Sequence, residues 1–97
     1  MKQRKIHTSD KLEIDVIDIL NSKSVSFIHE SEEGFPRKGN RTLDFYLPYF
    51  DIYIEVKANH TDRLYDQIKQ YEDLSNPNII VVIGKSGVDF LKALTEI

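Results

Sequence analysis

The sequence contains no cysteine. This excludes disulfide bonds, thiolate nucleophiles and zinc sites built from sulfur, and it fits the reducing cytoplasm. Long apolar runs are also missing, because the longest, residues 79–83, is far too short to span a bilayer. The basic N-terminus MKQRKIHTSD lacks the apolar stretch of a signal peptide. We therefore expect an intracellular, cytoplasmic protein that does not contact a membrane.

Basic residues are too few for a protein that coats nucleic acid through its overall charge, since the formal net charge is −3. They gather instead in two patches, one near the N-terminus and one in a loop: Lys2, Arg4 and Lys5, then Arg37, Lys38 and Arg41. Solvated loop charges are the simpler interpretation of such clusters. The 97 residues suffice for one domain, 1–97, with one compact core, but not for a large buried cofactor cavity.

Hydrophobic periodicity and turn residues predict an α/β domain. The expected helices cover 9–23, a stretch from 61 or 62 to about 74, and 88–97. The expected strands cover 25–30, 42–47, 50–58 and 79–83, the last being buried on both faces. This order, α-β-β-β-α-β-α, predicts a mixed sheet with helices on both faces.

The segment LDFYLPYFDIYIEVKA places two carboxylates and an ammonium among the hydrophobic residues of the expected sheet. Side chains two apart on a strand point the same way, so Glu55 and Lys57 should project together from one face. Asp44 should point away from its apolar neighbours Leu43 and Phe45. A tight antiparallel pairing of the two strands could then bring Asp44 beside Glu55.

Two carboxylates at such a distance require either a bound cation or a proton. Their hard oxygen atoms, with a backbone carbonyl from Val56, suit Mg²⁺, for which Mn²⁺ is a common substitute. Lys57 could orient or deprotonate an attacking water, or neutralise charge on a phosphate. The pattern therefore indicates phosphodiester hydrolysis. A surface salt-bridge network of Asp44, Glu55 and Lys57 is the alternative.

The spacing of Asp44 and Glu55-Val56-Lys57, together with the expected element order, resembles the PD-(D/E)XK nuclease superfamily. The likeness runs from about residue 9 to residue 83, and one departure is Leu43, where the motif of that family has proline. The resemblance implies a restriction-endonuclease-like αβββαβ core and a Mg²⁺-dependent DNA endonuclease, similar to small phage, restriction and repair enzymes. A homodimer or a partner subunit is also expected, because cutting both strands concurrently needs two active sites.

Two further residues come from this resemblance. A first-helix glutamate often joins the metal site in the superfamily, and Glu13 has that place here. The alternative is a capping box, in which Asp10 and Glu13 satisfy helix N–H groups. Gln67 matches a glutamine that lines the site, although a surface amide is the simpler interpretation. Arg37, Lys38 and Arg41 are expected to bind the phosphates that flank the cut.

Other residues that could take part in binding or catalysis carry less specific signals. His7 and His29 are too scattered for a zinc site, so a structural role or exposure is expected. Tyr46 and Tyr53 should share the face of Asp44 and are expected to pack rather than to stack on bases. Glu30, Glu32 and Glu33 are expected to form a solvated acidic turn.

Two other functions stay open for the whole chain. One is a subunit with a nuclease fold that binds DNA or a protein without cutting. The other is a metal-dependent hydrolase of small phosphorylated molecules, which the absence of a Gly-rich phosphate loop disfavours.

Overall fold

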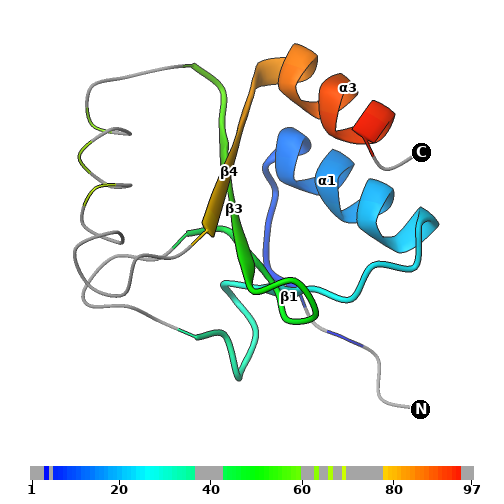
Figure 1. Cartoon of the computed structure of the whole chain (residues 1–97), viewed down its shortest axis with the longest axis vertical. Coiled ribbons are helices and arrows are strands. Elements are labelled where there is room, and N and C mark those ends of the chain that lie inside the picture. Colours follow the sequence, from blue (N-terminus) through cyan, green and yellow to red (C-terminus); the bar gives the residue numbers. More distant parts are fainter. Residues whose placement is uncertain are drawn as a thin grey trace.

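The computed structural model describes residues 4, 6–36, 43–59, 63, 66, 69 and 78–94. They form a small α/β domain in which two helices pack on a four-stranded mixed sheet (Figure 1). The elements are α1 (Lys11–Ser22), β1 (Ile28–His29), β2 (Phe45–Leu47), β3 (Ile52–Lys57), β4 (Asn78–Ile83) and α3 (Gly84–Leu94). None of the helices in these ranges is long and apolar enough to cross a membrane.

The strands lie in the order β1-β2-β3-β4. The β1–β2 and β2–β3 pairs are antiparallel, and β3 and β4 are parallel along their whole length. A tight turn joins β2 to β3, in which Asp51 has a φ of 52° and the Phe50 N–H donates to the Leu47 carbonyl at 3.2 Å. This turn sets the register that pairs Phe45 with Ile54.

The main core lies between the sheet and the two helices, which cover the same face of the sheet (Figure 1). Its buried residues are Val16, Ile19, Leu20, Phe27, Phe45, Leu47, Ile54, Val56, Val82, Val88 and Leu91. A smaller cluster lies apart from it and consists of Phe35, Leu43 and Tyr53. Because Ile54 and Val56 enter the main core, Glu55 between them projects to the other face of the sheet.

Individual residues fix the starts of both α1 and α3. The Asp10 carboxylate caps α1 by accepting hydrogen bonds from the N–H groups of Leu12 and Glu13, at 2.8 and 3.1 Å. Gly84, with a φ of 64°, lets the chain turn directly from β4 into α3. The first turn of α3 lies so close to β4 that a Cβ atom on Gly87 would be 3.1 Å from the Val82 carbonyl carbon.

Several predicted boundaries differ from the structure. The last helix begins at Gly84 rather than at residue 88, because the glycine starts the helix as well as ending the strand. The strand predicted over 25–30 is only Ile28–His29, and that over 42–47 is only Phe45–Leu47. Leu43 does not share the side of Phe45, since it belongs to the smaller cluster with Tyr53.

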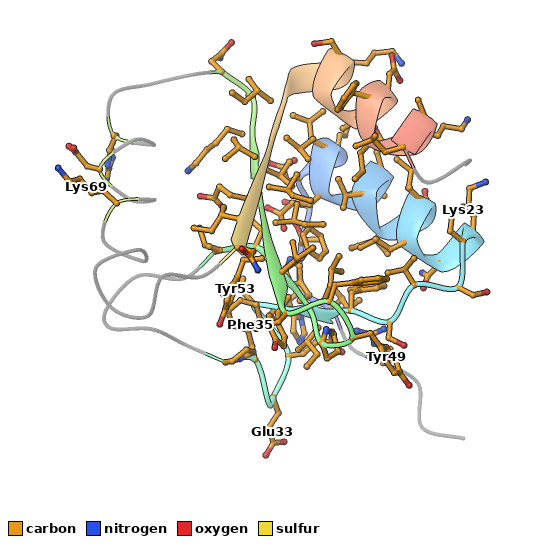
Figure 2. All side chains as sticks on the ribbon, viewed as in Figure 1. Lys23, Glu33, Phe35, Tyr49, Tyr53 and Lys69 are labelled. Atoms are coloured by element: carbon orange, nitrogen blue, oxygen red, sulfur yellow. The ribbon has the colours of Figure 1, made fainter. Side chains whose placement is uncertain are left out.

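The predicted cover of both sheet faces by helices is tested only in part. In the part of the chain that the structure describes, α1 and α3 share one face. The helix predicted up to about residue 74 falls largely outside the described residues. The three positions described there, Arg63, Asp66 and Lys69, are helical and exposed. Lys69 lies on the side of the sheet opposite to α1 and α3 (Figure 2).

Candidate functional site

Asp44 is held by hydrogen bonds at the point where β2 begins. Its N–H donates to the Ile54 carbonyl at 3.1 Å, and its own carbonyl accepts from the Glu30 N–H at 3.0 Å. The carboxylate is held as well, because Oδ2 accepts from the Val56 N–H at 2.7 Å. The register of β2 and β3 places Asp44 opposite Glu55, as the sequence predicted. Asp44 therefore cannot move away from Glu55 without losing backbone hydrogen bonds.

Glu55 is a buried acid with incomplete hydrogen bonding. The residue is only 1% exposed. Its Oε2 lies 3.5 Å from the Lys57 ammonium, but its Oε1 is buried and accepts no hydrogen bond from the described residues. An unsatisfied buried polar atom costs about 1–3 kcal/mol, and more when it is charged. This burial also argues against the alternative of a solvated surface network.

The two carboxyl groups interact strongly. Burial, followed by hydrogen bonding and charge repulsion with Glu55, raises the pKa of Asp44 from 3.8 to about 8. The Val56 N–H and the Lys57 charge oppose this increase. Without a bound cation the Asp44 carboxyl is therefore mostly protonated at neutral pH, and its hydroxyl can donate to Glu55.

Lys57 completes the predicted group on β3. Its side chain is 39% exposed, whereas that of Glu55 is 2% exposed. The ammonium thus lies between the buried carboxylate and solvent.

Glu13 on α1 turns inward, and its contacts differ from those of the capping box, the alternative considered for it. The Asp10 N–H donates to the Thr8 hydroxyl at 3.2 Å, and Glu13 Oε1 lies 2.6 Å from His29 Nε2. Burial raises the pKa of Glu13, the hydrogen bond with His29 lowers it, and the nearby Asp44 charge raises it. Asp10 is therefore a simple cap, while Glu13, like Glu55, interacts electrostatically with Asp44.

His29 is the residue that sequence analysis undervalued. It is 1% exposed, so of the two expectations for it, a structural role and exposure, the second is wrong. Its ring packs edge-on against Phe45, with centroids 5.1 Å apart. A signal was present in VSFIHE, because alternation places His29 on the same face as the apolar Phe27.

Arg4 has a structural partner within its own chain. It donates to both oxygens of the Glu32 carboxylate and to the Phe27 carbonyl, and its guanidinium lies 4.3 Å from the centre of the Phe27 ring. Glu32 also accepts from the His29 N–H at 2.9 Å. The prediction of a solvated acidic turn is therefore wrong for Glu32, whereas Glu33 is exposed (Figure 2).

The two tyrosines are packing residues. Tyr53 is 2% exposed and its hydroxyl donates to the Pro36 carbonyl at 3.0 Å. The Tyr46 hydroxyl donates to Asp51 at 2.9 Å, and the two tyrosine rings lie 4.9 Å apart. The expectation that they pack is confirmed. Several other predicted residues lie outside the described part of the chain: Lys2, Lys5, Arg37, Lys38, Arg41 and Gln67.

The possible metal ligands are few. Within the described residues, no group of three or more histidine, aspartate or glutamate side chains is arranged to hold a metal ion. The carboxylates that lie together are Asp44 and Glu55. Mg²⁺ is commonly bound by one or two carboxylates, with waters and phosphate oxygens as its other ligands.

Comparisons with family profiles, with curated proteins and with solved structures found no match to this chain. The residues and their geometry therefore carry the functional argument.

Proposed function

We propose that the protein is a Mg²⁺-dependent DNA endonuclease of the PD-(D/E)XK type with a restriction-endonuclease-like fold. The observation that carries this proposal is the buried Oε1 of Glu55, which accepts no hydrogen bond from the residues that the structure describes and belongs to a carboxylate pair with Asp44. A purely structural role would not require this unsatisfied oxygen atom, because an apolar residue at position 55 would avoid the free-energy cost of burying it. A cation that binds between two carboxylates would remove that cost too.

The residues present fit Mg²⁺, with Mn²⁺ as a substitute. Asp44 and Glu55 would hold the ion, together with the Val56 carbonyl and with Glu13 either directly or through water. When bound, the ion would polarise a phosphate oxygen and lower the pKa of a water molecule. The hard oxygen atoms of the carboxylates disfavour soft metal ions, and the chain has no cysteine thiolate to bind such ions.

The chain's own residues supply the remaining functions. The exposed end of Lys57 would contact the scissile phosphate or orient the attacking water, while its other interaction, with Glu55, keeps the ammonium at the site. Gln67 would line the site. Arg37, Lys38 and Arg41 would bind flanking phosphates, and a homodimer or a partner subunit would present a second site for the opposite strand.

Cleavage of a panel of labelled DNA molecules in Mg²⁺ tests the proposal. The panel should contain single strands, duplexes and branched structures, because the small domain offers little surface for reading bases. Glu55→Gln keeps the shape of the side chain but removes its charge. We expect it to reduce the cleavage rate by more than about 100-fold, since even groups that only support a metal ligand contribute 10–100-fold.

The matched control is Glu33→Gln, which makes the same chemical change on an exposed turn (Figure 2). It should cleave at the rate of the unmodified protein. The proposal is wrong if the unmodified protein cuts nothing in the panel with Mg²⁺ or Mn²⁺. Equal rates for the unmodified protein and Glu55→Gln would show that the metal site is misassigned. A protein that binds DNA without cutting it would support the non-cleaving subunit instead.

A further inference from the structure

The buried imidazole of His29 has hydrogen-bond partners on both of its nitrogen atoms, yet none of the steps above uses it. Nε2 lies 2.6 Å from Glu13 Oε1, and Nδ1 lies 2.8 Å from the Ser31 hydroxyl oxygen. Nδ1 also accepts from the Ser31 N–H at 3.1 Å. The ring therefore joins α1 to the turn that follows β1.

The partners of the ring define which nitrogen carries hydrogen. A backbone N–H can only donate, so Nδ1 is the acceptor in its contact with Ser31. The Ser31 hydroxyl oxygen accepts from the His7 N–H at 2.9 Å, which leaves the hydroxyl hydrogen free to point to Nδ1. Nε2 then carries hydrogen and donates to Glu13, because a carboxylate accepts.

The surroundings hold the ring in a single orientation. The His29 N–H donates to Glu32 Oε1 at 2.9 Å, and Glu32 is itself held by Arg4. The rings of Phe45 and His29 are in edge-to-face contact at an interplanar angle of 69°. A donor that is fixed in this way can select one rotamer of the flexible glutamate that it contacts.

We propose that His29 is a positioning residue, whose Nε2–H holds the Glu13 carboxylate beside Asp44 so that Glu13 can contribute to the metal site. This inference rests on the proposed function. It differs from a purely structural role, because it predicts that loss of the Nε2 donor weakens metal binding more than it weakens the fold. The pairing of β1 with β2 sets His29 opposite Phe45, the residue that follows Asp44, so the Glu13 carboxylate that contacts His29 lies near the segment that carries Asp44.

Two isosteric substitutions separate the nitrogen atoms. The amide of His29→Gln reaches approximately the position of Nε2 and can still donate to Glu13. The shorter amide of His29→Asn reaches approximately the position of Nδ1 and contacts only the Ser31 side. Both variants lose the ring and its packing on Phe45, so a difference between them reports the donor. Binding of Mn²⁺ alone, measured by calorimetry, and the Mg²⁺ dependence of cleavage are the two readouts.

We expect His29→Asn to weaken Mn²⁺ binding by about 10-fold or more and to raise the half-maximal Mg²⁺ concentration equally. The rate at saturating Mg²⁺ should fall much less. His29→Gln should restore most of the metal affinity. In a Glu13→Gln background, His29→Asn should add no further loss, because the group that it positions has already lost its charge.

A measurement on the unmodified protein avoids dependence on the folding of the variants. Addition of diamagnetic Mg²⁺ should shift the NMR signal of His29 Nε2–H. The Mg²⁺ concentration at the midpoint of this shift should agree with the Mg²⁺ affinity measured by competition with Mn²⁺. An unshifted signal in a protein that binds metal would overturn the inference, as would equal metal affinity of the Gln and Asn variants. Absence of metal binding and cleavage in the unmodified protein would instead overturn the proposed function, and the inference with it.

Discussion

Replacement of Asp44 by Asn should stabilise the metal-free protein. It should also remove most of the pH dependence of its free energy of unfolding between pH 4 and 8. The native pKa of Asp44 is about 8, whereas its ordinary value is 3.8. Asn has nearly the same shape and no charge. Its Oδ1 can accept from the Val56 N–H as Asp44 does, and its NH₂ group can donate to the unsatisfied Oε1 of Glu55.

The magnitude follows from the two pKa values. Between pH 3.8 and about 8 the native state keeps the Asp44 proton and the unfolded state loses it. The native state therefore binds more protons, so the free energy of unfolding falls as pH rises through this range. Each pH unit costs about 1.4 kcal/mol, so the loss at pH 7 reaches at most about 4 kcal/mol. Asp44→Asn should recover an amount up to this value at pH 7 and almost nothing at pH 4.

Urea unfolding in EDTA, at several pH values from 4 to 9, measures this difference directly. The pKa of Glu13 is raised as well, but burial is the largest cause and is the same in both proteins, so the difference between them comes mainly from Asp44. The control is Asp18→Asn, which changes an exposed aspartate on α1. Saturating Mg²⁺ should stabilise the unmodified protein and have little effect on Asp44→Asn, since a ligand that binds only the native state stabilises it.

Two results would refute this reasoning. A stability difference between the unmodified protein and Asp44→Asn that is the same at pH 5 and pH 8.5 would show that Asp44 ionises normally in the fold. A loss of stability at pH 7 in Asp44→Asn would show that the carboxylate pair is favourable without metal.

The remaining predictions concern the cationic residues. Lys57→Ala should lower the cleavage rate while leaving Mn²⁺ affinity in calorimetry nearly unchanged, because a protonated lysine cannot ligate a metal; equal losses in both would show that Lys57 is structural. Neutralising Arg37, Lys38 and Arg41 together should reduce the slope of log K against log[salt] for DNA binding by up to about three, and an unchanged slope would place these residues away from DNA. As a contrast, Arg4→Gln should lower the stability in urea without altering that slope, because Arg4 already pairs with Glu32.

The sequence predicted those parts of the site that depend on local geometry. Alternation along β3 correctly separated the core residues Ile54 and Val56 from Glu55, because a strand has a period of two. The short connection between β2 and β3 allowed a single useful register, and that register places Asp44 opposite Glu55. Both inferences needed only the segment 43–58.

Contacts between distant segments could not be predicted in the same way. The hydrogen bond from His29 to Glu13 spans 16 residues, and it depends on how α1 lies against the sheet. The pairing of Arg4 with Glu32 depends on the path of the N-terminal segment. Periodicity states which face of an element is apolar, but not which polar groups of two elements meet. For this reason a solvated cation and a cation held in a structural ion pair, such as Arg4, looked alike in the sequence.

The pair of acids is the place where this fold departs most from what stability alone would favour. Asp44 receives or makes hydrogen bonds with three backbone groups, so repulsion from Glu55 cannot be relieved by moving either chain segment. A proton or a cation must relieve it instead. When a proton on Asp44 does so, the buried Oε1 of Glu55 depends on the neutral Asp44 carboxyl for a hydrogen bond. A scaffold that holds two acids together more rigidly than their charges favour has already supplied part of the ordering that a metal ion would otherwise impose. Because of this pre-organisation, variants of Asp44 and Glu55 that are more stable without metal should also bind the metal less tightly.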